Sequence, residues 1–491
     1  MITLESDRFG KEPTLIDALL DEQQRLTAVE KFTQRHETSD RPQQARYYRE
    51  LLPAKTPGAG QQYAFEVDLD QCSGCKACVT ACHNLNGLDE DETWRSVGLL
   101  HGGTSEQPVQ QTITTACHHC IDPACLHGCP VNAYEKDAAT GIVRHLDDQC
   151  IGCQYCLWKC PYQVPQYHAR KGIVRKCDLC SNRLVAGEAP ACVQACPNKA
   201  IRITLIDQER ITLGLTVQIQ TANPFLPGSP DPGYTLPTTR YKTKNPLPAN
   251  MTPGDLHDFK PQCAHPSLAI MLVLAQLSVG TFCLDLLLGP VAGPSLTALL
   301  RPILSLVAWA IGLAGISASL FHLGRPWFAW RAFVGLKRSW LSREIVAFGT
   351  FMLLAALYTA SNWFGALRFS SRAFEAGLGL AVTATGLAGV FCSVMVYHDT
   401  RRIFWQAAYT APKFFGTSLL LAVASALCLI VSVNFRAKAP PADPALVTAV
   451  QALCVLLIVS ASAKLACASP LVGWRSSTVR KCGTASAYLP W

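Results

Sequence analysis

Charge is scarce in this sequence of 491 residues: only 16% are Asp, Glu, Lys or Arg, whereas 49% are hydrophobic. That balance is too apolar for an ordinary soluble protein. Acidic residues are scarcest from Cys263 onward, where 17 Lys and Arg accompany only 5 Asp and Glu. The first 262 residues hold the other 26 and 30, so the overall net charge of +8 arises in the apolar half. A basic stripe with interleaved aromatic residues is missing, which argues against nucleic-acid binding.

The opening residues, MITLESDRFGKEPTLIDALLDEQQRL, lack a basic segment followed by an apolar run, and they lack a twin-arginine pair. We therefore expect no secretory signal. Residues 1–60 are polar, and Thr14 is placed to cap an amphipathic helix. The apolar face of that helix comprises Leu15, Ile16, Leu19, Leu20, Leu26, Val29 and Phe32. Two interpretations stay open: the helix packs on its own domain, or it docks on a partner.

Long apolar stretches appear only after His265. Six of them, of about 20 residues or more each, are long enough as helices to cross a hydrocarbon layer of about 30 Å. They lie near residues 266–289, 302–321, 345–365, 374–397, 414–434 and 446–467. We expect six transmembrane helices in contact with membrane lipid. Histidine is nearly absent here: only His322 and His398 follow the first stretch, both at stretch ends, so no haem is expected.

Cysteine is abundant, with 23 residues, and sixteen of them fall in four sets between residues 61 and 205. The sets are Cys72, Cys75, Cys78 and Cys82; Cys117, Cys120, Cys125 and Cys129; Cys150, Cys153, Cys156 and Cys160; and Cys177, Cys180, Cys192 and Cys196. A C-x2-C-x2-C loop can wrap three thiolates around one iron–sulfur cubane, while a fourth cysteine ligates a different cluster. The sixteen cysteines therefore predict four [4Fe–4S] clusters.

Zinc and disulfide bonds are the alternative uses of these cysteines. A zinc ribbon needs two C-x2-C pairs separated by a dozen or more residues, and only the fourth set resembles that spacing. Four thiols within eleven residues, as in the first and third sets, do not suit tetrahedral zinc. A secreted disulfide scaffold does not fit these spacings either. Iron–sulfur clusters are the favoured interpretation.

The chain divides by composition into four segments. Residues 1–60 form a polar, helical extension, and residues 61–205 a four-cluster ferredoxin-type domain. Residues 206–262 carry nine prolines from Pro224 to Pro261 with glycines between them, which predicts an extended tether and not a core. Residues 263–491 form a membrane anchor. The expected fold class is an α+β bis-ferredoxin-like iron–sulfur domain followed by an all-α, multi-span transmembrane helix bundle.

The stretches CSGCKACVTACH, CHHCIDPACLHGCP, CIGCQYCLWKCPY and CDLCSNRLVAGEAPACVQACP resemble the four-cluster iron–sulfur subunit of the dimethyl sulfoxide reductase family of molybdenum enzymes. The resemblance covers residues 62–205 and all sixteen cysteines. It implies a pairing of the sets, one with four and two with three. Cys72, Cys75 and Cys78 would then share a cluster with Cys196, and Cys177, Cys180 and Cys192 one with Cys82. Likewise Cys117, Cys120 and Cys125 would go with Cys160, and Cys150, Cys153 and Cys156 with Cys129.

The stretches LFHLGRPWFAWRAF and SWLSREI resemble the membrane-anchor subunit of the same family. There, the histidine of H-L-G and the glutamate of S-x-E are associated with quinol oxidation, which implicates His322 and Glu344. An imidazole can accept a hydrogen bond from a quinol hydroxyl, and a carboxylate can carry the proton to water. Arg325 and Arg343 are candidate quinol or headgroup contacts. The alternative is that these residues only anchor helix ends at the interface. The family's anchor has eight spans, so this chain departs from it.

The resemblance implies that two normally separate subunits are fused in this chain. It would oxidise menaquinol or ubiquinol, relay electrons through four clusters, and pass them to a separate molybdopterin-containing catalytic subunit that reduces a small oxyanion, sulfoxide or N-oxide. The alternative is a membrane redox module without a molybdenum partner. Eleven basic residues on the cluster side of the membrane against five opposite place the clusters in the cytoplasm. Well-known relatives face outward, so a periplasmic position is the alternative.

Overall fold

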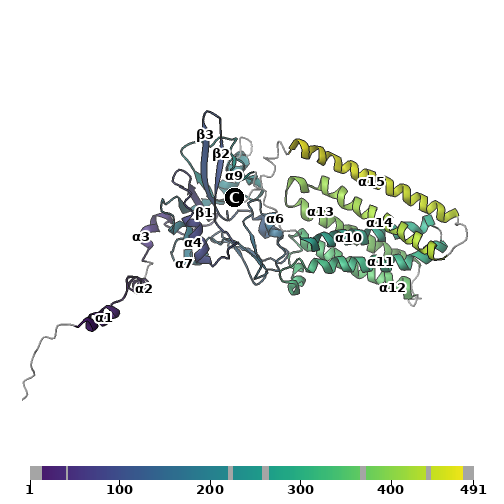
Figure 1. The fold of residues 1–491 in the computed structure, drawn as a ribbon, viewed down its shortest axis with the longest axis horizontal. Helices are drawn as coiled ribbons and strands as arrows, with labels where there is room; N and C mark the ends of the chain where they lie inside the picture. Colours follow the sequence, from purple (N-terminus) through teal and green to yellow (C-terminus); the bar gives the residue numbers. More distant parts are fainter. Residues whose placement is uncertain are drawn as a thin grey trace, which may run out of the picture.

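The computed structural model describes residues 14–39, 43–218, 225–256, 265–292, 294–364, 372–437 and 444–478. Parts of three predicted segments lie outside these residues: 1–13 and 40–42 of the extension, 219–224 and 257–262 of the tether, and 365–371, 438–443 and 479–491 of the anchor, among others. Figure 1 shows a cysteine-rich body beside a bundle of long helices, with an N-terminal arm reaching away from both.

The arm consists of α1 (Leu15–Gln24) and α2 (Ala28–Thr38), and it leads into α3 (Ala45–Tyr48) and the 3-10 helix η1 (Arg49–Leu51). Thr14 caps α1 as predicted: its hydroxyl accepts from the Asp17 backbone N–H, and the Asp17 carboxylate accepts from the Thr14 N–H. None of the residues of α1 or α2 is buried. The single helix predicted from the apolar face is thus two helices, α1 and α2, and that apolar face stays exposed in both.

The cysteine-rich body is built on two small sheets and two hairpins. In the first sheet, β1 (Gln61–Asp68) pairs antiparallel with β8 (Ile201–Asp207) and parallel with β9 (Arg240–Lys242). In the second, β2 (Ser96–Gly103) lies between β3 (Pro108–Thr115) and β10 (Thr252–Pro253). The hairpins are β4 (Tyr134–Lys136) with β5 (Val143–His145), and β6 (Gln166–His168) with β7 (Ile173–Arg175).

Short helices lie between these strands and carry five of the sixteen cysteines; the others lie in the loops beside them. These helices are α4 (Ala77–Asn86), α5 (Ala124–Gly128), α6 (Tyr155–Lys159), α7 (Ser181–Val185) and α8 (Ala191–Gln194), and α9 (Gln208–Gln218) follows β8. Lys76, Gln154 and Cys180 precede α4, α6 and α7 in the left-handed conformation. Each therefore turns the chain sharply from a loop that holds cysteines into the helix that follows.

The segment predicted as a tether contributes to the core. It contains the 3-10 helix η2 (Pro232–Tyr234) as well as β9 and β10. Leu226 and Met251 are buried together with Val67, Leu100 and Ile113. The expectation that residues 206–262 lie outside a core is therefore wrong for the described part. Proline suits this role because short edge strands do not need an N–H at every position.

The bundle comprises α10 (Pro266–Ala292), α11 (Pro294–Leu320), α12 (Trp340–Phe364), α13 (Arg372–His398), α14 (Ala407–Ala437) and α15 (Pro444–Thr478). The 3-10 helices η3 (Pro326–Phe333) and η4 (Ile403–Trp405) lie in its connections. Among the described residues, five helices are long and apolar enough to span a membrane, α10 to α14. The sixth expected span falls on α15, whose described apolar part is the shorter Val450–Leu465.

Candidate functional site

Three cavities in the cysteine-rich body are each lined by four cysteines. Cys72, Cys75, Cys78 and Cys196 line one of about 310 Å³. Cys117, Cys120, Cys125 and Cys160 line one of about 370 Å³, and Cys129, Cys150, Cys153 and Cys156 line one of about 280 Å³. We call them site 1, site 3 and site 4, respectively. Each combines three cysteines of one motif with the last cysteine of another, which is the donor set of a [4Fe–4S] cluster.

The remaining four cysteines, Cys82, Cys177, Cys180 and Cys192, form site 2. Burial and the neighbouring thiols of Cys192 and Cys180 raise the pKa of Cys82 to about 12. Helices α4 and α8, which carry Cys82 and Cys192, pack against each other. Closely spaced buried thiols that resist ionisation in the free protein fit a cationic metal cluster that would compensate their charge. All sixteen cysteines therefore fall into the groups that the resemblance implies.

The four sites follow one another in a line. Cys78 of site 1 and Cys82 of site 2 lie on the same helix, α4. Burial, and next the charge of Cys117 of site 3, raise the pKa of Cys177 of site 2, so sites 2 and 3 are neighbours. Burial, and next the charges of Cys156 of site 4 and Cys125 of site 3, raise the pKa of Tyr134. Tyr134 is therefore close to both sites. Helix α6 at site 4 lies beside the bundle, whereas α4 and α7 lie at the far end (Figure 1).

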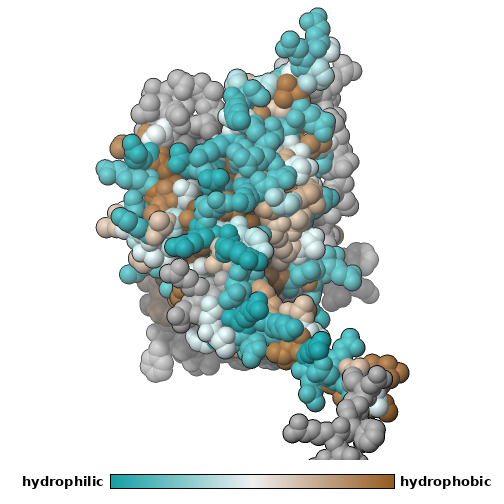
Figure 2. All heavy atoms as spheres, turned by 90° about the vertical axis from the view of Figure 1, so that its left-hand side faces the viewer, coloured by the Kyte–Doolittle hydropathy of each residue, from teal (hydrophilic) through white to brown (hydrophobic). Residues whose placement is uncertain are grey.

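The far end of this line meets solvent. Cys75 of site 1 is exposed, and so are Lys76 and Asn198 around it. Figure 2 shows that the end of the molecule away from the helix bundle is largely hydrophilic, with smaller apolar areas. The chain thus places site 4 against the apolar bundle and site 1 near solvent.

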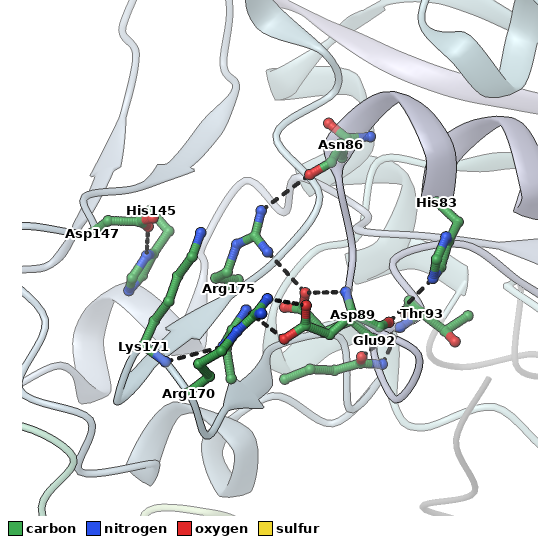
Figure 3. Close-up of polar contacts among 12 residues, drawn as sticks. His83, Asn86, Asp89, Glu92, Thr93, His145, Asp147, Arg170, Lys171 and Arg175 are labelled. Carbon is green, nitrogen blue, oxygen red and sulfur yellow. Dashed lines mark hydrogen bonds and ion pairs between the residues drawn. The ribbon is translucent and has the colours of Figure 1, made fainter.

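A cluster of charged and polar side chains joins the loop after α4 to the β6–β7 hairpin (Figure 3). The Arg175 guanidinium donates to Glu92 at 2.8 Å and to the Asn86 carbonyl at 3.2 Å. Asp89 pairs with His168 at 2.9 Å and with Arg170. These contacts tie the loop after α4, the helix of Cys78 and Cys82, to the β6–β7 hairpin, which leads into Cys177.

His322 lies where the bundle meets site 4. Its Nε2 is 3.2 Å from the carbonyl oxygen of Cys153, a cysteine of site 4, and it must donate in that contact. Burial lowers the pKa of His322, a trend that the Cys153 carbonyl opposes and His265 reinforces. The neutral ring then has a free lone pair on Nδ1. His322 is therefore joined by one hydrogen bond to the backbone of Cys153, with its Nδ1 available as an acceptor.

Glu344 is buried near the start of α12, with 4% of its surface exposed. Its carboxylate accepts a hydrogen bond from the Ser393 hydroxyl on α13. Burial and the charges of Asp399 and Glu344 raise the pKa of Tyr155, which lies between two cysteines of site 4. The structure thus brings His322 and Glu344 to the same segment of site 4, although no hydrogen bond joins them.

Arg325 and Arg343 both bind backbone carbonyls. The Arg325 guanidinium donates to the carbonyls of Asp147 at 2.9 Å and Lys171 at 3.4 Å, both in the cysteine-rich body. Arg343 donates to the carbonyls of Leu336 and Lys337 within its own loop. Arg325 therefore joins the two halves of the molecule, and Arg343 shapes the loop between α11 and α12.

The contact between the halves includes residues that sequence reasoning missed. Lys159 of α6 pairs with Asp399 at 2.7 Å, and the Tyr155 hydroxyl donates to the Val396 carbonyl at 2.7 Å. A Cβ on Gly324 would overlap the carbonyl of Gly172, so the backbones touch there. His265 stacks edge-on against His322 with ring centroids 4.7 Å apart. Only the position of His265, directly before an apolar stretch, is a signal readable from sequence.

Comparisons with known proteins agree with both halves of this arrangement. Residues 109–205 match the family model described as a 4Fe–4S dicluster domain. Residues 263–479 match the model described as the DMSO reductase anchor subunit (DmsC). Neither model covers residues 1–60.

Individual relatives match the cysteine-rich half. The B subunit of the anaerobic dimethyl sulfoxide reductase of Haemophilus influenzae is 38% identical over 173 residues, 33% of this chain and 84% of the relative. The corresponding B subunit from Escherichia coli is 37% identical over 157 residues, 30% of this chain and 76% of the relative. Formate dehydrogenase-O iron–sulfur subunit of Escherichia coli is 34% identical over 158 residues, 29% of this chain and 52% of that protein. The chain therefore belongs to the dimethyl sulfoxide reductase family, as an iron–sulfur subunit fused to a DmsC-type membrane anchor.

Proposed function

We propose that this chain oxidises a quinol, menaquinol or ubiquinol, beside His322 and Glu344 and relays the electrons through four [4Fe–4S] clusters at sites 4, 3, 2 and 1. When bound, such clusters accept and release single electrons. A separate molybdopterin-containing subunit would receive the electrons at site 1. The observation that carries the proposal is the hydrogen bond from His322 to the Cys153 carbonyl.

The residues around His322 suit the loss of two protons from a quinol. The neutral imidazole presents Nδ1 as an acceptor, while Nε2 is held by the Cys153 carbonyl. Glu344, enclosed next to Ser393, offers a second acceptor on the same side of the bundle. Arg325 and Arg343 enter the proposal as residues that hold the surrounding backbone and not as direct quinol contacts. Proton acceptance beside the first electron acceptor would couple the two transfers.

The position of site 1 supports transfer to a partner subunit. Cys75 is exposed in the loop directly before α4, a helix on the side of the cysteine-rich body away from the bundle (Figure 1). The N-terminal arm starts on this part of the body: His36 of α2 lies 3.8 Å from Glu188, and Glu50 pairs with Lys199 next to site 1. Helix α1 carries Asp17, Asp21 and Glu22 on its polar side, which disfavours an anionic membrane surface. A catalytic subunit seated at site 1 is therefore the occupant that we propose for its apolar face.

We place the iron–sulfur domain in the cytoplasm, because basic residues are more numerous in the connections on its side of the bundle. Arg325, Arg331, Lys337 and Arg338 lie in the connection between α11 and α12 that contacts this domain. The periplasm is the alternative compartment.

Purification of the tagged protein from native membranes under anaerobic conditions tests the partner. We expect a large co-purifying subunit, molybdenum, and iron equivalent to four clusters. Iron without molybdenum and without that subunit would contradict the reductase assignment and favour a redox module that serves another complex.

A further inference from the structure

Arg95, directly before β2, is a buried cation that the function described so far leaves unused. Only 2% of its surface is exposed, and it is among the largest side chains with so little exposure. Its Nη1 donates to the Thr114 hydroxyl at 3.2 Å, and its guanidinium carbon lies 4.4 Å from the centre of the Phe65 ring. In the described part of the chain, Nε and Nη2 have no hydrogen-bond partner, and no carboxylate pairs with this guanidinium.

A buried guanidinium with unpaired N–H groups and no carboxylate partner lowers the stability of the fold. Leaving one buried N–H unsatisfied costs about 1–3 kcal/mol, and an unpaired buried charge costs more. Phe65 offers a cation–π contact, which offsets only part of that cost. The site therefore requires an anion close to Nε and Nη2.

The nearest anionic groups belong to two different cluster sites. The Thr114 hydroxyl that accepts from Arg95 lies 3.6 Å from Cys78 Sγ of site 1. Phe65, against which the guanidinium lies, belongs to the same buried cluster as Cys78, Cys177 and Cys192. Burial lowers the pKa of Arg95, whereas the charges of Cys192, Cys78 and Cys177 raise it. Cys192 and Cys177 belong to site 2. Arg95 thus lies between sites 1 and 2.

Lys176 provides a contrast at the next junction of the line. Its ammonium is equally enclosed, 3.6 Å from Cys117 Sγ of site 3 and adjacent to Cys177 of site 2. It donates to the carbonyls of Cys177 and Val143 as well, so each of its N–H groups has a partner. Arg175, another enclosed cation, pairs with Glu92. The orphaned N–H groups of Arg95 are therefore not a general property of enclosed cations in this domain.

We propose that Arg95 is the shared counter-charge of the clusters at sites 1 and 2, and that it raises the reduction potentials of both. Each one-electron reduction adds one negative charge to a cluster, and a fixed positive charge in a poorly polarisable surrounding favours that step. Hydrogen bonds from Nε and Nη2 to cluster or thiolate sulfur would act in the same direction. Arg95 thus acts on electron transfer through the reduction potentials of the clusters at sites 1 and 2, and not as a ligand of either cluster. The inference rests on the proposed cluster content.

Redox titration of the full-length protein, followed by electron paramagnetic resonance, tests this role. Arg95→Gln removes the charge and keeps a hydrogen-bonding group, whereas Arg95→Lys keeps the charge. We expect Arg95→Gln to lower two of the four midpoint potentials, and Arg95→Lys to restore them in large part. A Cys75→Ser variant identifies which signal belongs to site 1. The matched control is Arg25→Gln, a surface arginine paired with Asp21, which should change none.

If the variants take up clusters poorly, their iron content, which measures how many clusters they hold, still tests the proposal. Loss of two clusters from Arg95→Gln, with retention in Arg95→Lys, also supports the proposal, because charge alone then separates the variants. Unchanged potentials in Arg95→Gln at full iron content would overturn it. Equal loss in both variants would overturn it as well, since shape and not charge would then matter. Fewer than four clusters in the parent protein would instead contradict the proposed function.

Discussion

At the scale of single residues, the cysteines that would hold the clusters differ from residues such as Arg95, which would adjust the environment of those clusters. The sixteen cysteines are recognisable by their spacing, and twelve of them line three cavities in the groups that the family resemblance implies. Arg95 could not be found this way, because a lone arginine in the polar stretch DETWRS carries no pattern. Its role emerges only when folding removes it from water and places it between two cysteine groups.

Removing a ligand of site 4 should interrupt the line at the membrane. Cys156 is buried at the start of α6, and we expect Cys156→Ser to lose this cluster, or about a quarter of the total iron. The other three sites share none of its ligands and should stay reducible by dithionite. Iron analysis and electron paramagnetic resonance check this outcome. Loss of all four clusters would show that they do not assemble independently.

At the scale of elements, the cysteine-rich body and the helix bundle touch at Gly324 through their backbones, without side chains between them. Gly324 follows α11, and a Cβ there would overlap the carbonyl of Gly172. We expect Gly324→Ala to weaken this contact by about 1–3 kcal/mol, as overpacking does elsewhere. The measurement is the temperature at which the visible absorbance of the clusters is lost. Gly349→Ala is the matched control, because a Cβ there meets nothing within 4 Å; equal effects of both changes would contradict the prediction.

The exposed face of α1 gives a second prediction at this scale. Leu20→Asp should weaken association with the catalytic subunit by roughly ten- to a hundredfold, since a buried leucine contributes about 1.5–3 kcal/mol. Co-purification at graded protein concentration measures it. Gln24→Asp adds the same charge on the polar side of α1 and should have little effect. If both variants keep the partner, the arm does not bind it.

The elements differ in how far sequence predicts them. Long apolar stretches locate each of α10 to α14, although α11 and α14 begin at Pro294 and Ala407, before the predicted 302 and 414. Such stretches are visible in sequence because a membrane-spanning helix satisfies its own backbone hydrogen bonds in an apolar setting. The strands β9 and β10 were missed, because they are three and two residues long and pair with strands more than a hundred residues away. Proline content predicted a tether there, and tertiary pairing decided otherwise.

At the scale of the whole molecule, the fusion puts the proposed quinol residues and the four cysteine sites into one chain. Lys159 with Asp399, and Arg325 with the Asp147 carbonyl, tie the two halves together beside site 4. Under the proposed function, electrons that enter near His322 would have site 4 as their first acceptor. They would leave at site 1, where Cys75 is exposed.

Orientation is a prediction about the molecule as a whole. If the iron–sulfur domain faces the cytoplasm, trypsin should not cleave at its exposed basic residues, such as Arg170, in intact spheroplasts. In inverted membrane vesicles the same sites should be accessible. Cleavage in spheroplasts alone would place the domain in the periplasm.

Quinol-driven reduction of the clusters in isolated membranes tests the central claim most directly. The account predicts that His322→Ala slows reduction by a menaquinol analogue about 100-fold or more, the scale of a lost proton acceptor, and leaves reduction by dithionite intact. His398→Ala, a change in another histidine at the end of a membrane helix, serves as control and should behave as the parent. Equal rates of quinol-driven reduction in the parent and in His322→Ala would show that quinol is not oxidised beside His322.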